Sequence, residues 1–199
     1  IDDAPHSNCI TPELQVALLP CCAVAARLIQ FTDPHLYGDA AATLRGIATL
    51  PALERALAHA QAPLREASAV LVTGDIVQDD AAGYAHFRRL FASLGKPVHC
   101  IPGNHDLLDA MHVALAGPPF VLGGHFDAGA WRVVMLDSAV AGMASGELTP
   151  AALAQLDLAL GTAGGRHAPC APHSARRASP SGRLRAPSSP TASLPLRPP

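Results

Sequence analysis

Short apolar runs alternate with helical patterns through most of the chain, from about residue 27 to residue 168. The apolar runs have the length of buried strands, and the stretches between them repeat their apolar residues every three or four positions. The predicted strands cover residues 27–32, 69–73, 97–101 and 131–136. Alternating strands and helices are typical of βαβ units, so this pattern predicts an α/β domain over residues 27–168.

Three stretches have the spacing of helices. Residues 43–60 form an amphipathic stretch that we expect to break near Pro51, and residues 84–94 form a second. A third helix is predicted to begin with Thr149 as its N-cap and Pro150 at the first helical position. One face of this last helix carries Leu153, Leu156 and Leu160.

The two ends of the chain differ from the middle. Residues 1–26 have no clear periodicity and are interpreted as an irregular N-terminal extension. Residues 169–199 include eight prolines, six serines and five arginines, with no acidic residue. Proline this frequent blocks helix and sheet, and no apolar face remains to offset the entropy of ordering. We therefore predict a disordered tail from Pro169 onward.

Charge and cysteine content exclude some classes of protein. A net charge of −2 gives no general attraction to nucleic acid or to anionic membranes. The apolar run at residues 16–29 contains Pro20, follows acidic residues and is too short to span a membrane. Five scattered cysteines without a CxxC pair suit a reducing compartment, which predicts a cytoplasmic protein. The sequence gives no indication of the oligomeric state.

Polar clusters follow three of the predicted strands. Asp33-Pro34-His35 follows the first strand, Gly74-Asp75 the second, and Gly103-Asn104-His105-Asp106 the third. The carboxyl ends of strands in an α/β sheet form its ligand crevice, so these clusters should meet at one edge. Each motif alone is weak, because D-x-H and G-D are also common in surface turns and helix caps. Their joint occurrence at successive strand ends indicates a shared site.

The residue types in these clusters suit two divalent metal ions, which could be Fe, Mn or Zn. Asp75 has two carboxylate oxygens and could bridge both ions, which would activate a hydroxide and clamp a phosphoryl group. His105 could donate a proton to the leaving oxygen. Asp106 could hold the His105 imidazole in position.

At these residues the chain resembles the calcineurin-like metallophosphoesterases, and within them the class III cyclic-nucleotide phosphodiesterases, which hydrolyse 3′,5′-cyclic AMP. The matching stretches are residues 28–36, 72–79, 98–106, 131–138 and 146–148. The resemblance implies a four-layer α/β/β/α sandwich and a small phosphodiester as substrate. It also implies that Asp33 and His35 bind the first metal, that Asp75 bridges, and that Asn104 binds the second. His35, Asp75, Asn104 and His105 would then surround the phosphate.

The chain departs from the family pattern after residue 168. The family has a further histidine on a later strand and then a G-H-x-H motif, and neither follows here. His173 lies near the expected place, but its flanking residues do not resemble a strand, so we expect its position to be coincidental. A shift of reading frame near residue 168 would explain the change in composition. We therefore expect an incomplete second sheet, weak metal binding, low stability and little activity.

Two other functions remain open at this point. The chain could belong to another branch of the superfamily that acts on phosphomonoesters, nucleotides or other diesters. It could also be a non-catalytic remnant that binds one metal ion or a protein partner.

Overall fold

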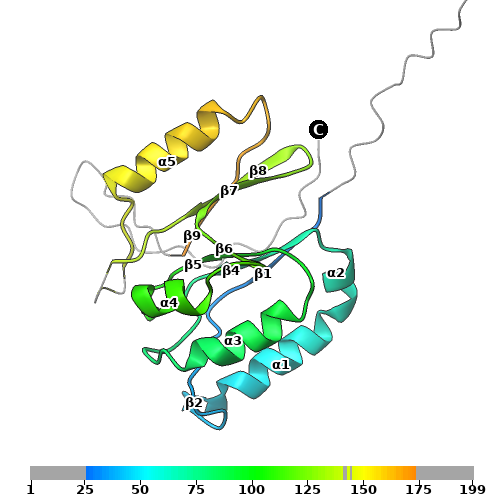
Figure 1. Cartoon of the computed structure of the whole chain (residues 1–199), viewed down its shortest axis with the longest axis vertical. Coiled ribbons are helices and arrows are strands. Elements are labelled where there is room, and N and C mark those ends of the chain that lie inside the picture. Colours follow the sequence, from blue (N-terminus) through cyan, green and yellow to red (C-terminus); the bar gives the residue numbers. More distant parts are fainter. Residues whose placement is uncertain (1–25, 141–142, 144, 174–199) are drawn as a thin grey trace, which may run out of the picture.

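The computed structural model describes residues 26–140, 143 and 145–173. These residues form four layers: helices, a first sheet, a second sheet and one further helix (Figure 1). The predicted α/β/β/α architecture is therefore confirmed. The predicted N-terminal extension, apart from Ala26, and the tail beyond His173 lie outside the described residues. Within the described part of the chain, no helix combines the length and apolar character needed to cross a bilayer.

The first sheet contains four parallel strands in the order β1-β4-β5-β6. Their bounds are Leu28–Phe31 for β1, Ala69–Thr73 for β4, Val98–Ile101 for β5 and Phe120–Leu122 for β6. Every residue of the two central strands, β4 and β5, is buried. Strands covered on both faces are apolar along their whole length, which explains why these runs lack polar alternation.

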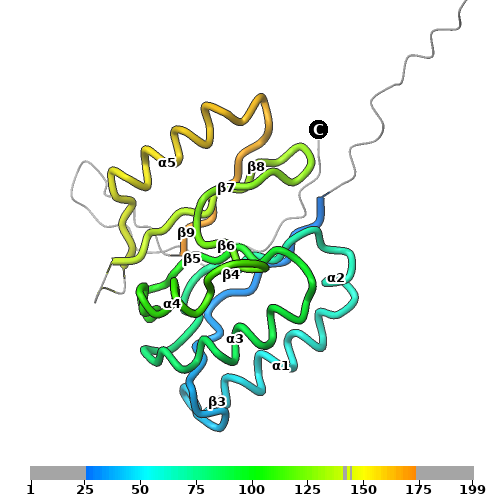
Figure 2. Tube along the Cα trace, viewed as in Figure 1, coloured from blue at the N-terminus to red at the C-terminus, as the bar shows by residue number. Residues whose placement is uncertain are grey.

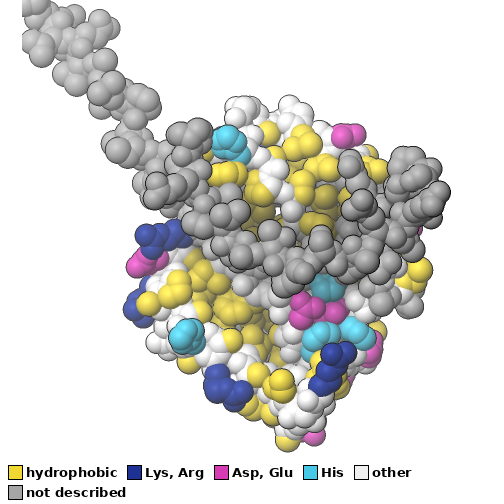
Figure 3. Space-filling model, turned by 180° about the vertical axis from the view of Figure 1, so that it is seen from behind, with side chains coloured by type: hydrophobic (Ala, Val, Ile, Leu, Met, Phe, Trp, Pro, Cys, Tyr) yellow, Lys and Arg dark blue, Asp and Glu magenta, His cyan; other side chains and the backbone are white. Residues whose placement is uncertain are grey.

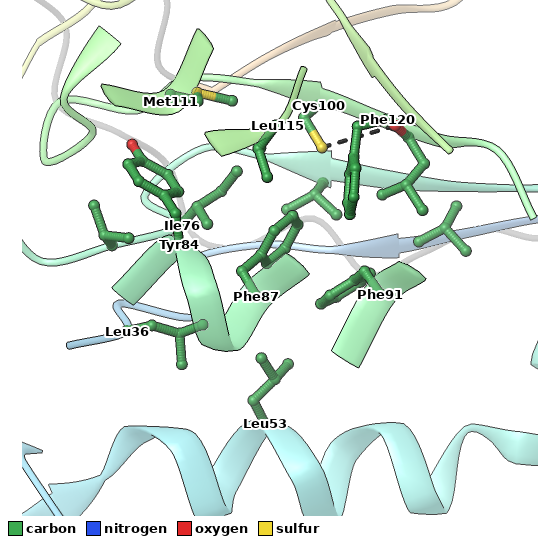
Figure 4. Close-up of a cluster of buried hydrophobic side chains, with 14 of the residues drawn as sticks. Leu36, Leu53, Ile76, Tyr84, Phe87, Phe91, Cys100, Met111, Leu115 and Phe120 are labelled. Carbon is green, nitrogen blue, oxygen red and sulfur yellow. Dashed lines mark hydrogen bonds between the residues drawn. The ribbon is translucent and has the colours of Figure 1, made fainter. Parts of the chain in front are cut away.

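Helices cover the outer face of the first sheet (Figure 2). They are α1 (Thr49–His59), α2 (Gln61–Glu66), α3 (Gly83–Ala92) and α4 (Leu108–Ala114). Phe87 and Phe91 of α3 stack with ring centroids 4.3 Å apart and lie between the sheet and Leu53 of α1 (Figure 4). This main apolar core holds the sheet whose strand ends carry the polar clusters.

The second sheet contains three strands: β7 (Gly124–Ala128), β8 (Trp131–Leu136) and β9 (Cys170–Pro172). β7 pairs with β8 antiparallel, and β9 pairs with β8 parallel. Leu71 and Ile101 of the first sheet meet Val133 and Met135 of the second in a separate apolar layer. The two sheets therefore pack face to face.

The last helix, α5 (Pro150–Gly161), covers the outer face of the second sheet. Its predicted start is confirmed, because the Thr149 hydroxyl accepts a hydrogen bond from the Ala152 N–H. Arg132 of β8 binds both carboxylate oxygens of Asp127, at 2.7 and 2.9 Å, and donates to a carbonyl of α5. The same ion pair lowers the pKa of Asp127, mainly through the hydrogen bond from Arg132.

Two predicted elements differ from the structure. Residues 43–48 form a hairpin of β2 (Thr43–Leu44) and β3 (Ile47–Ala48), and the helix starts only at Thr49. Arg45 and Gly46 both have positive φ, as a two-residue hairpin turn requires, and no hydrophobic period reveals such a turn. The helix does not break at Pro51, because in the first turn the missing N–H leaves no bond unmade.

The predicted disordered tail is wrong for its first residues. β9 begins at Cys170 and continues the second sheet beside β8, with Val134 N–H donating to the Pro169 carbonyl at 3.0 Å. Proline is tolerated on an edge strand, where only one side of the backbone must pair. Composition alone therefore misplaced the end of the domain, and His173 directly follows a strand.

Candidate metal centre

Three predicted ligands lie together where β1 and β4 end. Ligand atoms of Asp33, His35 and Asp75 are all within 4.8 Å of one another. His35 Nε2 lies 3.9 Å from Asp33 Oδ1 and 3.7 Å from Asp75 Oδ2. Acidic and histidine side chains gather on this face of the molecule (Figure 3).

The backbone holds these three side chains in unusual conformations. Asp33, His35 and Asp75 have φ values of +55°, +45° and +47°, a region that non-glycine residues seldom adopt. Each such residue costs about 1–3 kcal/mol and persists only where its surroundings fix it. Here Asp33 N–H donates to the Gly74 carbonyl and His35 N–H to the Asp75 carbonyl, at 3.2 and 2.9 Å. The two loops therefore fix each other and turn their side chains inward.

The loop after β5 closes tightly against Asp75. A Cβ atom at Gly103 would lie 2.1 Å from Asp75 Oδ1, so only glycine permits this approach. His105 N–H donates to the same oxygen at 3.0 Å. Asp75 Oδ2 remains directed toward the histidines. The buried Asp75 is thus the residue on which all three polar clusters converge.

His173 completes the group, although its place was expected to be coincidental. Its Nδ1 lies 2.7 Å from the Thr73 carbonyl, and its Nε2 lies 3.5 Å from Asp75 Oδ2. Only a protonated Nδ1 can donate to a carbonyl, so in the neutral ring Nε2 carries a lone pair. Strand β9 is the reason for this position, because it runs parallel to β8 and ends beside β4.

The donor set fits a divalent cation. Nitrogen and oxygen ligands bind such ions at about 2.0–2.2 Å, so two ligands on one ion lie roughly 3–4 Å apart. The distances are 3.5 Å from His173 Nε2 to Asp75 Oδ2, 3.7 Å from His35 Nε2 to the same oxygen, and 3.9 Å from His35 Nε2 to Asp33 Oδ1. They agree with the spacing of two ligands on one ion and are longer than a normal hydrogen bond. In addition, His35 Nδ1 is buried with no hydrogen-bond partner in the described part of the chain. The lone pairs that face one another around His35 Nε2 and Asp75 Oδ2 point to a bound cation, and the unpaired Nδ1 lies on the other side of the His35 ring.

Asp79, and not Asp106, contacts the His105 imidazole. Asp79 Oδ2 lies 3.0 Å from His105 Nδ1, and Gln78 Nε2 donates to the same carboxylate. The hydrogen bond with His105 is the main cause of a lowered pKa at Asp79. The rings of His35 and His105 meet edge to face, with centroids 5.4 Å apart, so this imidazole stands beside the ligand group.

Asp106 has a different position from the one predicted. Its carboxylate is buried and accepts hydrogen bonds from the N–H groups of Gly103, Ile76 and Val77, at 2.8, 3.1 and 3.2 Å. The Tyr84 hydroxyl donates to it at 2.8 Å. Burial raises the pKa of Asp106, and these hydrogen bonds oppose that effect. Asp106 therefore joins the loops after β4 and β5 to α3 and leaves the imidazole to Asp79.

Two pockets flank the ligand group. One of about 480 Å³ is lined by Asn104, Leu107, Asp109 and Val140, among others. Another of about 360 Å³ lies beside Asp33 and His35. Asn104 is half-buried between Gly103 and His105, both of which contact Asp75.

Sequence reasoning missed two residues of the site. Asp79 was not among the predicted site residues. Asp79 has a φ of +53°, in the same unfavourable region as the three proposed ligands, and the sequence alone does not reveal this conformation. His173 follows Pro172 in a proline-rich segment, so composition predicted a tail there and not a strand.

Comparison with known proteins places the chain in a family. Residues 26–140 match the calcineurin-like phosphoesterases. The chain is 39% identical over 140 residues to the 3′,5′-cyclic adenosine monophosphate phosphodiesterase CpdA of Haemophilus influenzae, covering 69% of this chain and 50% of that protein. The proteins of the same name in Pseudomonas aeruginosa and Escherichia coli K12 are 35% and 34% identical, with 81% and 71% of this chain aligned.

The alignments also show how much of each relative's length this chain covers. They cover 56% and 52% of the Pseudomonas and Escherichia proteins, so the chain spans about half the length of these curated relatives. The family match runs from β1 through β8 and includes the loops that carry Asp33, His35, Asp75 and Asn104. The chain therefore belongs to the calcineurin-like phosphoesterase family.

Proposed function

We propose that this chain provides metal-binding and phosphate-facing residues of a phosphodiesterase that hydrolyses 3′,5′-cyclic AMP. The observation that carries the proposal is the convergence of Asp33, His35 and Asp75 within 4.8 Å at the ends of two parallel strands. The similarity to three proteins named as 3′,5′-cyclic AMP phosphodiesterases favours this substrate over other phosphoesters.

In this proposal two divalent ions, of Fe, Mn or Zn, occupy the site. Asp33, His35, Asp75 and His173 would hold the first, and Asp75 with Asn104 would contribute to the second. Ions bound there would polarise a phosphoryl oxygen and offset the charge that develops in an in-line displacement. His173 is our addition to the ligand set, and it supplies a fourth donor for the first ion.

The residues of the chain would then position the substrate and move one proton. His105 stands beside His35 with its Nδ1 held by Asp79, so its Nε2 is free to face the leaving oxygen. A carboxylate that fixes one ring nitrogen also selects the tautomer of the other. Asp106 would act only as a positioning residue, because its oxygens are occupied by backbone N–H groups and Tyr84.

Metal content and turnover test the proposal together. The purified chain is incubated with Mn²⁺, Fe²⁺ or Zn²⁺, gel-filtered and measured by elemental analysis. Asp75→Asn should abolish retained metal, whereas Asp109→Asn, an exposed carboxylate outside the ligand group, should leave it unchanged. Retention that is equal in wild type and Asp75→Asn would contradict the proposed site.

Substrate class is tested by comparing hydrolysis of cyclic AMP, p-nitrophenyl phosphate and bis(p-nitrophenyl) phosphate. The comparison uses this chain and a form extended to the length of the relatives. A preference for the monoester would favour the alternative superfamily function. Metal retention without turnover of any substrate by either form would favour a non-catalytic metal-binding protein.

A further inference from the structure

A pocket adjoins the metal centre on the side of the β2–β3 hairpin. It measures about 360 Å³ and lies between the segment that follows β1, the hairpin and α1. Asp33 and His35 form part of its wall, so a group bound in the pocket would touch the ligand set directly. Its volume falls within the range of small-molecule sites.

The lining of this hairpin pocket is mostly apolar, with Arg45 at the hairpin and Asp33 on the side of the ligand group. Phe31, Leu53 and Ile47 form apolar walls, and Ile47 is 59% exposed at the hairpin. Arg45 is the one Lys or Arg side chain among the lining residues, and it forms no ion pair or hydrogen bond with any described residue. A planar guanidinium above apolar walls is suited to an aromatic ring, which it can cover by stacking and cation–π attraction.

The hairpin fixes the backbone at Arg45. Each of its strands has two residues, and the turn between them places Arg45 at φ +51°. α1 follows the hairpin without a gap, and its buried Leu53 lies in the main core. Arg45 therefore lines the pocket from a short loop whose backbone is fixed by the hairpin.

The pocket beside Asn104 is more acidic than the hairpin pocket. Asp106 and Asp109 line it, and neither Lys nor Arg does. A nucleotide carries negative charge on its phosphate and a flat base, so the hairpin pocket matches it better than the acidic pocket.

We propose that the hairpin pocket binds the nucleoside part of a nucleotide whose phosphate lies at the metal centre, and that Arg45 and Ile47 determine specificity for the base. This inference rests on the function proposed above, because it needs phosphate at the ligand group. The phosphate then fixes one end of the nucleotide at the ligand group, and the hairpin determines which base is accepted at the other end.

The first test separates phosphate binding from nucleoside binding. Equilibrium binding of inorganic phosphate and of 5′-AMP to the Mn²⁺-loaded chain is measured for wild type, Arg45→Ala and Ile47→Ser. We expect the Kd for 5′-AMP to rise about 3- to 20-fold in each variant, because Arg45→Ala removes a cation–π contact and Ile47→Ser removes an apolar surface for the base. The Kd for phosphate should stay within about twofold, because neither side chain belongs to the ligand group. Arg55→Ala, an exposed arginine of α1 outside the pocket, serves as the matched control.

The outcomes distinguish failure of this inference from failure of the proposed function. Binding of 5′-AMP that is unchanged in both variants, with phosphate still bound, would overturn the hairpin site and leave the proposed function standing. Absence of binding for both probes would overturn the inference and the proposed function together.

A second test locates the base directly. Photolabelling with 8-azidoadenosine 5′-monophosphate, followed by peptide mapping, should label residues 44–53. Labelling of residues 104–113 instead would place the base in the acidic pocket and overturn the proposal.

Discussion

The hydroxyl of Tyr84 offers a sharp test of how the loops around the metal centre are held. Tyr84 is fully buried in α3 (Figure 4), and its hydroxyl donates to Asp106 Oδ1 at 2.8 Å. The hydroxyl oxygen of Tyr84 also accepts a hydrogen bond from Leu107 N–H at 3.1 Å. Burial beside the Asp106 carboxylate raises the pKa of Tyr84 far above its usual range, so the phenol stays protonated. Tyr84→Phe removes these two hydrogen bonds and keeps the ring.

The expected change in the free energy of unfolding follows from the two hydrogen bonds that Tyr84→Phe removes. A hydrogen bond to a charged group contributes about 1.5–3 kcal/mol, and a backbone N–H left without its partner costs up to about 1–3 kcal/mol more. Leu107 is 40% exposed, so water can replace part of the second contact. We therefore expect Tyr84→Phe to lower the free energy of unfolding by about 2–4 kcal/mol. In urea this corresponds to a midpoint lower by roughly 1–2 M.

The assay is urea unfolding of the metal-free chain, followed by circular dichroism. Tyr37→Phe is the matched control, because Tyr37 is the other tyrosine of the chain and its hydroxyl makes no hydrogen bond with the described residues. That control should change the free energy of unfolding by less than about 0.5 kcal/mol.

A double-mutant cycle with Asp106→Asn tests the reasoning itself. An amide at this position turns its NH₂ toward N–H donors, so Asp106→Asn should cost at least as much as Tyr84→Phe. If the two side chains act together, the double mutant will be less destabilised than the sum of the singles by about 0.5–3 kcal/mol. Strictly additive changes, or a Tyr84→Phe change below about 0.5 kcal/mol, would refute this account.

Three further predictions concern separate contacts. His173→Ala should weaken retention of Mn²⁺ at least about tenfold by equilibrium dialysis, whereas His59→Ala, an exposed histidine of α1, should not. Asp79→Asn should lower kcat for cyclic AMP about tenfold or more in the extended form, with KM and metal content unchanged, because the Asp79 carboxylate binds His105 and Gln78 and lies outside the ligand group. Asp127 has a lowered pKa in the folded chain, so its ion pair stabilises the fold above about pH 4 and is lost as the pH falls through the folded pKa. Thermal unfolding at pH 3 to 6 should therefore show a shallower acid decline for Asp127→Asn than for wild type.

Periodicity predicted the parts of the fold that packing alone determines. β4 and β5 are buried along their whole length, so their apolar runs are unmistakable in the sequence. The polar residues that follow them meet because parallel strands end at one edge of the sheet. For the same reason, the closeness of Asp33, His35 and Asp75 could be predicted.

The features that the sequence did not predict depend on local backbone conformation, on side-chain direction or on a strand at the edge of a sheet. The β2–β3 hairpin arises from two positive φ values at Arg45 and Gly46, which leave no periodic signal. β9 is an edge strand, where proline is permitted, so its composition resembled a tail. The role of Asp106 was wrong because sequence adjacency to His105 says nothing of which way a side chain turns.

The metal centre is organised by contacts that involve no metal. The strained residues Asp33 and Asp75 are fixed by hydrogen bonds between their own loops, and Asp75 is fixed again by His105 N–H. Asp106 joins those loops to α3, which lies in the main core. Metal affinity should then follow fold stability, since ions bind only the folded arrangement. A variant such as Tyr84→Phe, which touches no proposed ligand, should weaken Mn²⁺ retention when denaturant populates the unfolded chain and leave it unchanged when the fold is fully populated. Weaker retention in the fully folded variant would instead mean that Asp106 sets the ligand geometry itself.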